Sequence, residues 1–383
     1  MNQLINILKM ESHNRPFKFP VSILIGSRPT IILKVIRGYR IDFRYYPKFA
    51  LTILVSLIFE VFNLAERIIF RKKLKTFQPE EPPVFIIGFW RSGTTLLHSL
   101  LCQDTRAGYV TTFQGVFPHL VLTQKQWFKA LINSLLPKKR PFDGYSMDMD
   151  FPQEEDFAMM SLQAKSLYKM FYFPKDFDDI YARELYFEQL PAKQRSLWEK
   201  EYMTIITKAL LNTGGKRYMS KNPCNIFRIN TLIKLFPEAK FIFIYRNPYP
   251  VVESLYRFVN EVLPGSELQH PEDGIPRERF ARLYKDALNE YMSAKENIPA
   301  YHLLEIKYED FKNQPLEMIR DIYSRFNMPG IEQALPHMES YLENNHPDSR
   351  EPYTIDPETY QLVNEYAADT LSKLGYERVE KFQ

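Results

Sequence analysis

One stretch of the 383-residue chain, residues 84–102 (VFIIGFWRSGTTLLHSLLC), constrains the fold more than any other. The run VFII is short, apolar and bounded by Pro83 and Gly88, as expected for a buried parallel strand, and TTLLHSLL begins a helix. Between them, Gly88, Ser92 and Gly93 let the backbone bend so that successive N–H groups and the positive end of the helix face one point. The stretch therefore predicts a strand, a turn and a helix that together bind a phosphate or sulfate.

The spacing within this turn argues against ordinary ATP hydrolysis. Gly88-x4-Gly93-Thr94-Thr95 is close to the nucleotide triphosphatase loop GxxxxGK[ST], but Thr94 occupies the position where that loop requires lysine. The cation of this turn is Arg91, which precedes the second glycine by two residues. An incidental glycine turn of an α/β protein is the competing interpretation, and the flanking strand and helix disfavour it.

The residues FWRSGTTLL (89–97) resemble the 5′-phosphosulfate loop, [YP]-[KR]-S-G-T-T-x-L, of sulfotransferases that use 3′-phosphoadenosine 5′-phosphosulfate (PAPS). The arginine form of the loop is similar to that of the Golgi tyrosine-protein enzymes and of many bacterial members. Trp90 replaces the usual proline before the basic residue and leaves the phosphate-holding groups unchanged. The resemblance implies that PAPS is the co-substrate. Its 5′-phosphosulfate would be held by Arg91, Ser92, Gly93, Thr94 and Thr95.

A second informative stretch is IYRNPYPVVESLYRF, residues 244–258. Arg246 ends a predicted strand, Pro248 and Pro250 begin a helix, and Ser254 lies two turns into that helix. Both side chains can then face the carboxyl edge of the sheet, where open α/β sheets bind their ligands. A guanidinium and a hydroxyl suit a phosphate dianion, and the arginine-x7-serine spacing matches the 3′-phosphate motif of sulfotransferases. Arg246 and Ser254 are therefore the predicted 3′-phosphate ligands.

Two weaker similarities extend the predicted cofactor site. HLLEIKYEDF (302–311) predicts a further strand that ends at Tyr308, and a similar YED in the family places the tyrosine ring near adenine, where it would stack on the base. A core tyrosine is an equally good interpretation of Tyr308. Near the C-terminus, Ser349 and Arg350 loosely resemble a basic loop that some family members fold over the 3′-phosphate.

Sulfuryl transfer requires an in-line acceptor, charge stabilisation on the transferring group and a base for the acceptor proton. The resemblance assigns Arg91 to the 5′-phosphate and the departing bridge oxygen. Lys221, in SKNP at the end of another predicted strand, is a candidate for a second cation, and a plain surface lysine is the alternative.

The base is harder to assign. The tyrosine-protein enzymes use a glutamate beyond the loop arginine, but the corresponding segment here, VTTFQG, contains no acid. PQEEDF (152–157) resembles an acidic motif of many bacterial relatives, so Glu154 or Glu155 is the leading candidate, followed by His119, whose residue type serves as the base in the cytosolic enzymes. Acidic residues are also favoured at a helix start by the dipole alone, which is the structural alternative.

The alternation of predicted strands and helices favours an α/β protein with a P-loop-like three-layer fold, in which helices flank a central, mainly parallel sheet. Residues 1–80 differ from the rest, because they contain isoleucine-rich stretches followed by YYPKFALTILVSLIFEVFNLAERIIFRKKLK. They predict an N-terminal helical appendage, joined through the proline-rich residues 79–83 to a catalytic domain over residues 81–383.

The apolar run at residues 49–59 is too short to span a membrane before Glu60, Asn63 and Glu66 interrupt it. An amphipathic helix fits this segment better. It either packs on the core or lies on a membrane surface with the basic residues 71–75 at the headgroups, and both arrangements remain open.

Composition narrows the class further. The hydrophobic fraction of 45% and the charged fraction of 25% are ordinary globular values, and a net charge of +4 gives no case for nucleic acid binding. Two cysteines without CxxC spacing argue against a disulfide framework or a zinc site and favour a reducing, cytoplasmic location. The first residues lack a signal-peptide pattern. No metal is expected, since neither a carboxylate pair for magnesium nor a Walker B strand is evident.

These features predict an enzyme that moves a sulfuryl group from PAPS to a hydroxyl or amine acceptor by in-line transfer. Two alternatives remain open: a P-loop kinase-like phosphotransferase, which Thr94 opposes, and a non-catalytic nucleotide-binding scaffold associated with a membrane. The 29 phenylalanines, 24 tyrosines and apolar N-terminal region suggest a small-molecule, lipid, sterol-like or glycan acceptor near a membrane, although such residues are also ordinary core material.

Overall fold

A computed structural model describes residues 22–345, apart from 124–125, 127, 131 and 133–147, and residues 354–380. Five strands form one parallel sheet in the order β2-β3-β1-β4-β5. They are β1 (Val84–Ile87), β2 (Ala107–Gly108), β3 (Arg217–Lys221), β4 (Lys240–Tyr245) and β5 (Leu303–Lys307). The predicted parallel α/β fold is confirmed. Strand β1 lies at the centre, so the turn that follows it lies between the carboxyl ends of β3 and β4.

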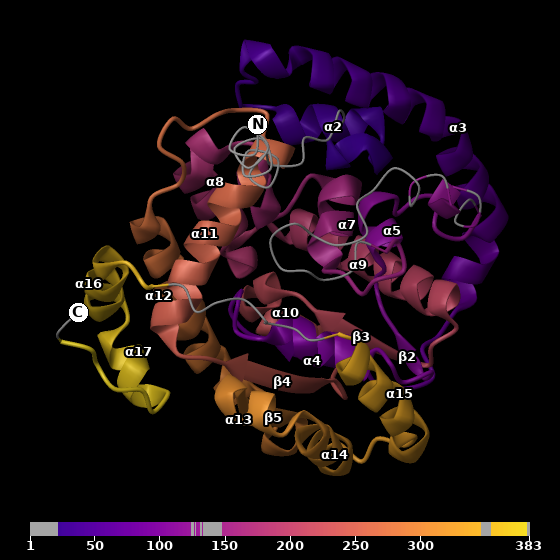
Figure 1. Cartoon of the computed structure of the whole chain (residues 1–383). Coiled ribbons are helices and arrows are strands. Elements are labelled where there is room, and N and C mark those ends of the chain that lie inside the picture. Colours follow the sequence, from indigo (N-terminus) through magenta and orange to yellow (C-terminus); the bar gives the residue numbers. More distant parts are fainter. Residues whose placement is uncertain are drawn as a thin grey trace, which may run out of the picture.

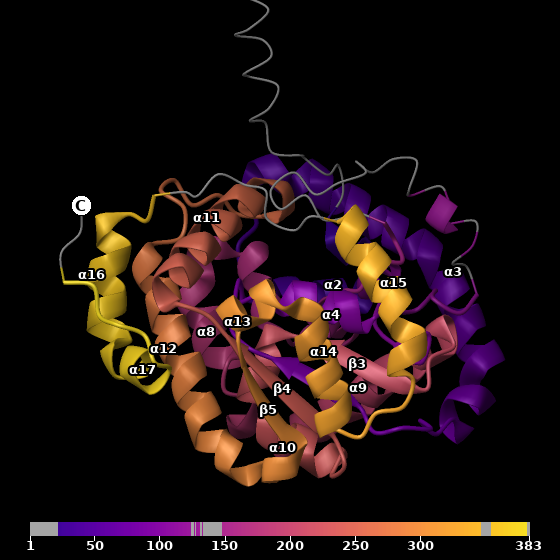
Figure 2. The same cartoon turned by 60° about the horizontal axis from the view of Figure 1, so that its bottom comes forward.

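Helices cover both faces of the sheet, as a parallel sheet requires (Figures 1 and 2). Val84 and Ile86 of β1 pack into an apolar cluster with helices of one face, and Phe85 and Ile87 pack into a larger cluster with helices of the other face. The first group includes α4 (Thr94–Leu101), α13 (Tyr308–Asn313), α14 (Pro315–Arg325) and α15 (Ile331–Asn344). The second includes α7 (Glu155–Gln163), α9 (Ala192–Thr213), α11 (Pro248–Ser266), α12 (Arg277–Ala294) and α16 (Pro357–Tyr366).

The segment after α4 departs from the sequence-based prediction. The sequence of residues 104–122 predicts a second strand and a turn, but the strand, β2, is only two residues long, and the chain turns at Thr111 into the short helix α5 (Thr112–Val116). The Thr111 hydroxyl caps this helix by accepting from the N–H of Gln114 at 3.2 Å. The sequence QWFKALINSLL (126–136) predicts a helix, and this segment lies largely outside the described residues.

Residues 261–300 contain a stretch rich in glycine and proline that predicts a loop and lid followed by a helix, but in the structure this region is mostly helical. Helix α11 continues through Pro264 to Ser266, and α12 begins at Arg277, so the irregular part is the segment that joins them. The remaining helices are α8 (Phe177–Glu184), α10 (Ile229–Leu235) and α17 (Ala368–Lys373), and several short 3₁₀ turns connect the elements.

The N-terminal region is helical and packs on the body of the protein. Helix α2 (Pro29–Ile36) contributes Ile31, Ile32 and Val35 to the larger core cluster. Helix α3 (Tyr46–Thr76) then runs for 31 residues along the upper right rim in Figure 1. Among the described residues, the segment from Phe43 to Thr76 is long and apolar enough to cross a membrane, by length and composition only.

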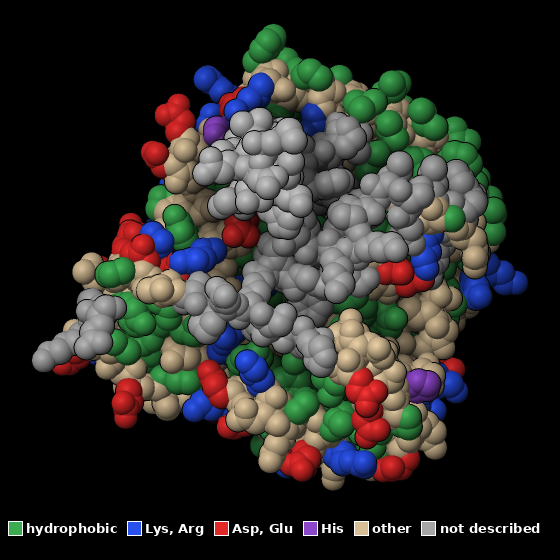
Figure 3. All heavy atoms as spheres, in the orientation of Figure 1, with side chains coloured by type: hydrophobic (Ala, Val, Ile, Leu, Met, Phe, Trp, Pro, Cys, Tyr) green, Lys and Arg blue, Asp and Glu red, His purple; other side chains and the backbone are tan. Residues whose placement is uncertain are grey.

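Helix α3 has its polar face inward and its apolar face outward. The buried face carries Thr52, Ser56, Asn63 and Glu66 beside Phe59. The opposite face exposes a stripe of aliphatic side chains, of which Val61 is 72% and Ile68 is 67% exposed, and Figure 3 shows hydrophobic side chains along this rim. This outer stripe consists of Leu51, Leu54, Leu57, Ile58, Val61, Leu64, Ile68 and Ile69. A surface helix of a soluble protein has the reverse pattern.

Candidate active site

The turn between β1 and α4 forms the predicted cradle. Gly93 is the N-terminal cap of α4 and has a left-handed backbone with φ 91°. A Cβ atom on Gly93 would lie 2.2 Å from Cδ2 of Tyr308, and one on Gly88 would lie 2.4 Å from the carbonyl oxygen of Ile244. Only glycine fits either position, because the backbone of the turn approaches β4 and the Tyr308 ring so closely. The first N–H groups of α4 have no partner within their own helix and are free to face an anion.

Arg91 joins the two predicted phosphate motifs. Its backbone is left-handed, with φ 68°, a conformation that costs a non-glycine residue about 1–3 kcal/mol and is typical of functional turns. Its Nε donates a hydrogen bond to Oγ of Ser254 at 2.9 Å. Arg246 donates from Nη1 to the carbonyl oxygen of Arg91 at 3.4 Å, and its guanidinium lies 4.5 Å from the centre of the Tyr308 ring. Arg91, Arg246, Ser254 and Tyr308 therefore form one cluster at the carboxyl edge of the sheet.

Lys221, the last residue of β3, belongs to the same edge. It is 3% exposed and forms an ion pair with Oε1 of Glu154, so it is not a plain surface lysine. The hydroxyl of Tyr168 donates to Oε2 of the same carboxylate, and Nε1 of Trp90 donates to the Tyr168 oxygen at 3.2 Å. A chain of polar contacts thus runs from the cradle to Glu154 and Lys221.

Trp90 and Tyr168 are the two residues of these polar contacts that the sequence analysis did not assign to the site. Trp90 gave a signal, because it departs from the proline of the family loop. Tyr168 gave none, since it lies in a short 3₁₀ turn remote in sequence from every motif. Both side chains are buried, and burial raises the pKa of the Tyr168 hydroxyl well above its usual value, so the hydroxyl stays protonated at neutral pH and donates a hydrogen bond to Glu154.

The other two acids of PQEEDF lie in buried structural networks. Oε1 of Glu155 accepts hydrogen bonds from Tyr202 at 2.6 Å, Ser220 at 2.6 Å and Asn225 at 2.9 Å. Burial raises the pKa of the Glu155 carboxyl, although these hydrogen bonds oppose the shift. These contacts fix the start of α7 against β3 and the turn after it.

Asp156 is held by charge instead. It accepts from Nη1 and Nη2 of Arg228 at 2.7 and 3.1 Å. Burial alone would raise the pKa of Asp156, but the charge and hydrogen bonds of Arg228 bring it below its usual value. Of the three neighbouring acids, Glu154 is the one whose carboxylate contacts Lys221.

His119 lies apart from this cluster. It lines a cavity between α3 and α9, and none of the residues that line this cavity belongs to the cradle, to the Arg246–Ser254 motif or to the Glu154–Lys221 pair. Burial and the charges of Lys208, Arg28 and Arg67 lower the pKa of His119 to about 3. Arg350, the last predicted cofactor ligand, lies outside the described residues.

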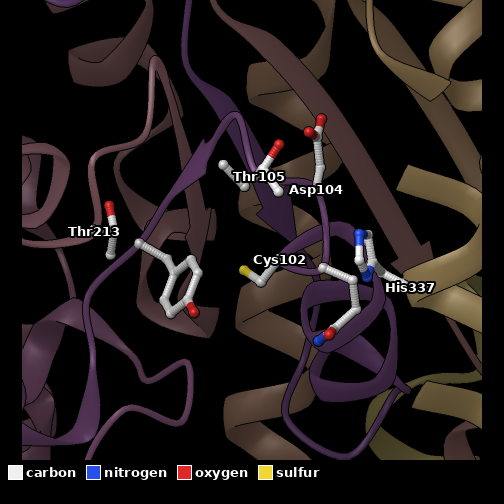
Figure 4. Close-up of a pocket in the computed structure, with 8 residues that line it drawn as sticks. Cys102, Asp104, Thr105, Thr213 and His337 are labelled. Atoms are coloured by element: carbon white, nitrogen blue, oxygen red, sulfur yellow. The ribbon is translucent and has the colours of Figure 1, made fainter. Parts of the chain in front are cut away.

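A smaller cavity of about 230 Å³ lies at the far end of α4 from the cradle. Figure 4 shows that its labelled side chains come from the end of α4, the following turn, α9 and α15. Burial raises the pKa of the Cys102 thiol well above its usual value, so this group is an unreactive neutral thiol. Cys102 and Cys224 are both buried and free. This cavity takes no part in the candidate site.

A parallel sheet whose central strand leads through a glycine turn into a helix N-terminus defines the class of P-loop-like, phosphate-binding α/β proteins. Within that class, a model of the Sulfotransferase family matches residues 82–333, from just before β1 into α15. The chain therefore belongs to the sulfotransferase family, and it is an enzyme that transfers a sulfuryl group. This assignment favours neither the kinase-like phosphotransferase nor the non-catalytic scaffold.

Similar proteins agree with this assignment. Omega-hydroxy-beta-dihydromenaquinone-9 sulfotransferase Stf3 of Mycobacterium bovis and of Mycobacterium tuberculosis is 28% identical over 325 residues, which cover 85% of this chain and 83% of the relative. Among solved structures, sulfotransferase STF9 from Mycobacterium avium has a TM-score of 0.66 at 17% identity, covering 92% of this chain and 97% of the other. Sulfotransferase STF1 from Mycobacterium tuberculosis has a TM-score of 0.62 at 14% identity, covering 88% and 90%. These two structures share the fold.

Proposed function

We propose that the enzyme takes its sulfuryl group from PAPS and transfers it to a hydroxyl group of a lipid-like acceptor. The hydrogen bond between Arg91 and Ser254 carries the proposal, because it joins the 5′-phosphosulfate loop to the 3′-phosphate motif. A donor with phosphate groups at both positions matches this pair of motifs. Such a donor is compatible with the cradle, since glycine at positions 88 and 93 lets the turn pack against Ile244 and the Tyr308 ring and brings the N-terminus of α4 to the carboxyl edge of the sheet.

The residues of the cradle bind and orient the donor. PAPS supplies an activated sulfuryl group whose leaving group is the 5′-phosphate. The N–H groups of residues 92–95 and the hydroxyls of Ser92, Thr94 and Thr95 hold this phosphate, and Arg91 stabilises the negative charge that develops on the bridge oxygen. Arg246 and Ser254 hold the 3′-phosphate, and the ring of Tyr308 stacks on the adenine.

Glu154 is the proposed base. As the new O–S bond forms and the S–O bond to the 5′-phosphate breaks, the proton of the acceptor hydroxyl passes to the Glu154 carboxylate. Lys221 neutralises charge on the transferring group and, with Tyr168, fixes the carboxylate. Glu155 is less suited, because it is fully buried and already accepts three hydrogen bonds. His119 is less suited because it lines the separate cavity between α3 and α9.

Two observations support the proposed class of acceptor. The relative of 28% identity is named for a hydroxylated dihydromenaquinone, a lipid-like quinone. The outer stripe of α3 gives this chain an apolar surface at which a membrane-dissolved alcohol would be met. We therefore propose peripheral association with the cytoplasmic face of a membrane. The residues up to 80 make this contact, and those from 81 onward perform the chemistry.

The test is a transfer assay with purified enzyme, PAPS and two acceptors, a long-chain isoprenoid alcohol in detergent and a soluble oligosaccharide. Sulfated isoprenoid alcohol detected by mass spectrometry is the expected product. Tight binding of ATP with no binding of 3′-phosphoadenosine 5′-phosphate in calorimetry would overturn the donor. Sulfation of the oligosaccharide alone would overturn the acceptor class and leave the donor intact.

A further inference from the structure

A cavity of about 930 Å³ separates α3 from α9, on the side of the molecule that carries the outer stripe. Its floor contains the buried residues Ile31, His119, Ile205 and Lys208. Leu64 and Ile68, two exposed members of the outer stripe, also line it. The cavity is therefore continuous with the apolar surface that we assign to the membrane. We name it the α3–α9 cavity.

The α3–α9 cavity has an excess of positive charge. Six lysine and arginine side chains and one glutamate line it. On its floor, Lys208 is neutralised by Glu66 at 2.6 Å, and at one side Arg28 is paired with Glu60 at 2.7 Å. The other four cations make no ion pair within the described part of the chain. These four are Arg67, Arg71, Lys75 and Lys200. Glu201 is the acid that lines the cavity beside them, so cations from two neighbouring helices outnumber the acid at one space.

A buried polar atom in the same cavity also lacks a partner. His119 is 9% exposed, and its Nε2 has no hydrogen-bond partner among the described residues. A buried nitrogen without a partner costs free energy, so it normally indicates a ligand or an ordered water molecule. Because the surrounding charges are positive, an anionic oxygen is the partner that fits both the imidazole N–H and the cations.

We propose that the α3–α9 cavity is a second ligand site, separate from the cradle, which binds the phosphate headgroup of an anionic phospholipid. The headgroup phosphate lies among Arg67, Lys200 and His119, and the acyl chains leave the cavity over Leu64 and Ile68. A free phosphate could satisfy the charges but not the apolar wall, so the lipid is the occupant that uses both. This site rests on the proposed contact of α3 with a membrane and gives that contact a preferred lipid.

The binding test uses monomeric short-chain lipids, so it does not depend on a bilayer. Dihexanoyl phosphatidylglycerol, kept below its micelle concentration, is titrated into the full chain by calorimetry and compared with dihexanoyl phosphatidylcholine and inorganic phosphate. We expect phosphatidylglycerol to bind at least about tenfold more tightly than either. Equal affinity for inorganic phosphate would reduce the site to a simple anion site and overturn the lipid assignment.

Variants then locate the binding. Arg67→Gln with Lys200→Gln should lower the affinity for phosphatidylglycerol by about tenfold or more, since both cations are proposed to contact the headgroup phosphate. The matched control, Lys312→Gln with Lys373→Gln, removes two exposed cations from elsewhere and should leave the affinity unchanged. His119→Phe keeps an aromatic ring, removes the N–H and should weaken binding as well. An equal loss in the control pair would overturn the site, because it would indicate general charge attraction.

Two further outcomes separate this site from the proposed function. Saturating 3′-phosphoadenosine 5′-phosphate should not displace phosphatidylglycerol, and displacement would assign the lipid to the cradle instead. Vesicle binding through α3 without any binding of the short-chain lipid overturns the second site and leaves membrane association standing. Binding of the short-chain lipid without vesicle binding supports the second site and overturns the proposed membrane association.

Discussion

The cradle and the α3–α9 cavity are the two anion sites that we propose, and they are built differently. The cradle is made of backbone, with a left-handed glycine and a left-handed arginine whose side chain is fixed on Ser254. The α3–α9 cavity instead offers four long, exposed cationic side chains that make no ion pair within the described residues, above a buried floor. Fixed backbone donors need no reorganisation when charge develops, which is what a reaction requires.

Long side chains lose rotamer freedom when they bind, so the α3–α9 cavity suits a headgroup that need not be placed accurately. The difference suggests that the protein separates reaction from attachment. The cradle determines the rate, and the surface formed by α3 and the α3–α9 cavity determines where the enzyme works. Changes in one region should therefore leave the measured property of the other unchanged.

The largest effect is expected at Arg91. Arg91→Ala removes the guanidinium that stabilises the leaving phosphate and should lower kcat with PAPS about a thousandfold or more, as for other charge-stabilising donors. Binding to anionic vesicles should not change. The measurement is steady-state sulfuryl transfer beside vesicle co-sedimentation, and Arg320→Ala on α14 is the matched control. Normal turnover in Arg91→Ala would show that the cradle is not the reaction site.

A variant of Arg246, which lies beside Arg91, distinguishes donor affinity from the rate of transfer. Arg246→Ala should mainly weaken the affinity for 3′-phosphoadenosine 5′-phosphate, because its proposed contact is with the 3′-phosphate and not with the reacting atoms. Calorimetry measures this affinity. A loss confined to kcat would contradict the assignment of Arg246.

Glu154 should give the next largest effect. Glu154→Gln keeps the shape and removes the proton acceptor, so kcat should fall about a hundredfold to a thousandfold. Glu155→Gln should act mainly on stability, because Oε1 of Glu155 accepts three buried hydrogen bonds. Kinetics and denaturant unfolding on both variants distinguish the two roles. Full kcat in Glu154→Gln would exclude it as the base.

Substitutions in the outer stripe of α3 should affect vesicle binding and not turnover. Val61→Gln with Leu57→Gln removes two exposed aliphatic side chains and should weaken vesicle binding about thirtyfold or more, since each contributes at least about 1 kcal/mol when buried in lipid. Turnover with a detergent-dissolved acceptor should stay unchanged. Leu197→Gln, an exposed leucine of α9, is the control. Unchanged vesicle binding would end the proposed separation of reaction and attachment.

The same comparison explains what the sequence could predict. The cradle depends on local order, a strand followed by glycines and a helix, and so this strand, turn and helix could be predicted from the sequence. The outward direction of the apolar face of α3 depends on tertiary hydrogen bonds, such as those from the N–H groups of Leu122 and Thr123 to Glu66 at 2.9 and 3.1 Å. Asn63 and Glu66 were interpreted as interruptions of an apolar run, whereas they form its buried polar face.

Distance in sequence limited the prediction of the site as well. The ion pair between Lys221 and Glu154 joins β3 to the start of α7, and no spacing rule connects the two residues. Glu154 and Glu155 are adjacent and chemically alike, so only their surroundings distinguish a carboxylate at the site from one in the core. The length of β2 was overestimated for a local reason, because the chain turns at Thr111 into the capped helix α5.

The smallest predicted effect tests the connection between the cradle and the base. Tyr168→Phe removes the hydroxyl that donates to Glu154 and accepts from Trp90, without creating a large cavity. A hydrogen bond to a charged group contributes about 1.5–3 kcal/mol, and Lys221 still holds the carboxylate, so kcat should fall about tenfold. Because Tyr168 positions the base and does not bind the donor, the affinity for 3′-phosphoadenosine 5′-phosphate should stay the same. Tyr172→Phe, which removes another buried tyrosine hydroxyl, is the control for stability. If Tyr168→Phe changes unfolding as Tyr172→Phe does but leaves kcat intact, the contact between Tyr168 and Glu154 is structural and the reaction depends on the cradle and Lys221 alone.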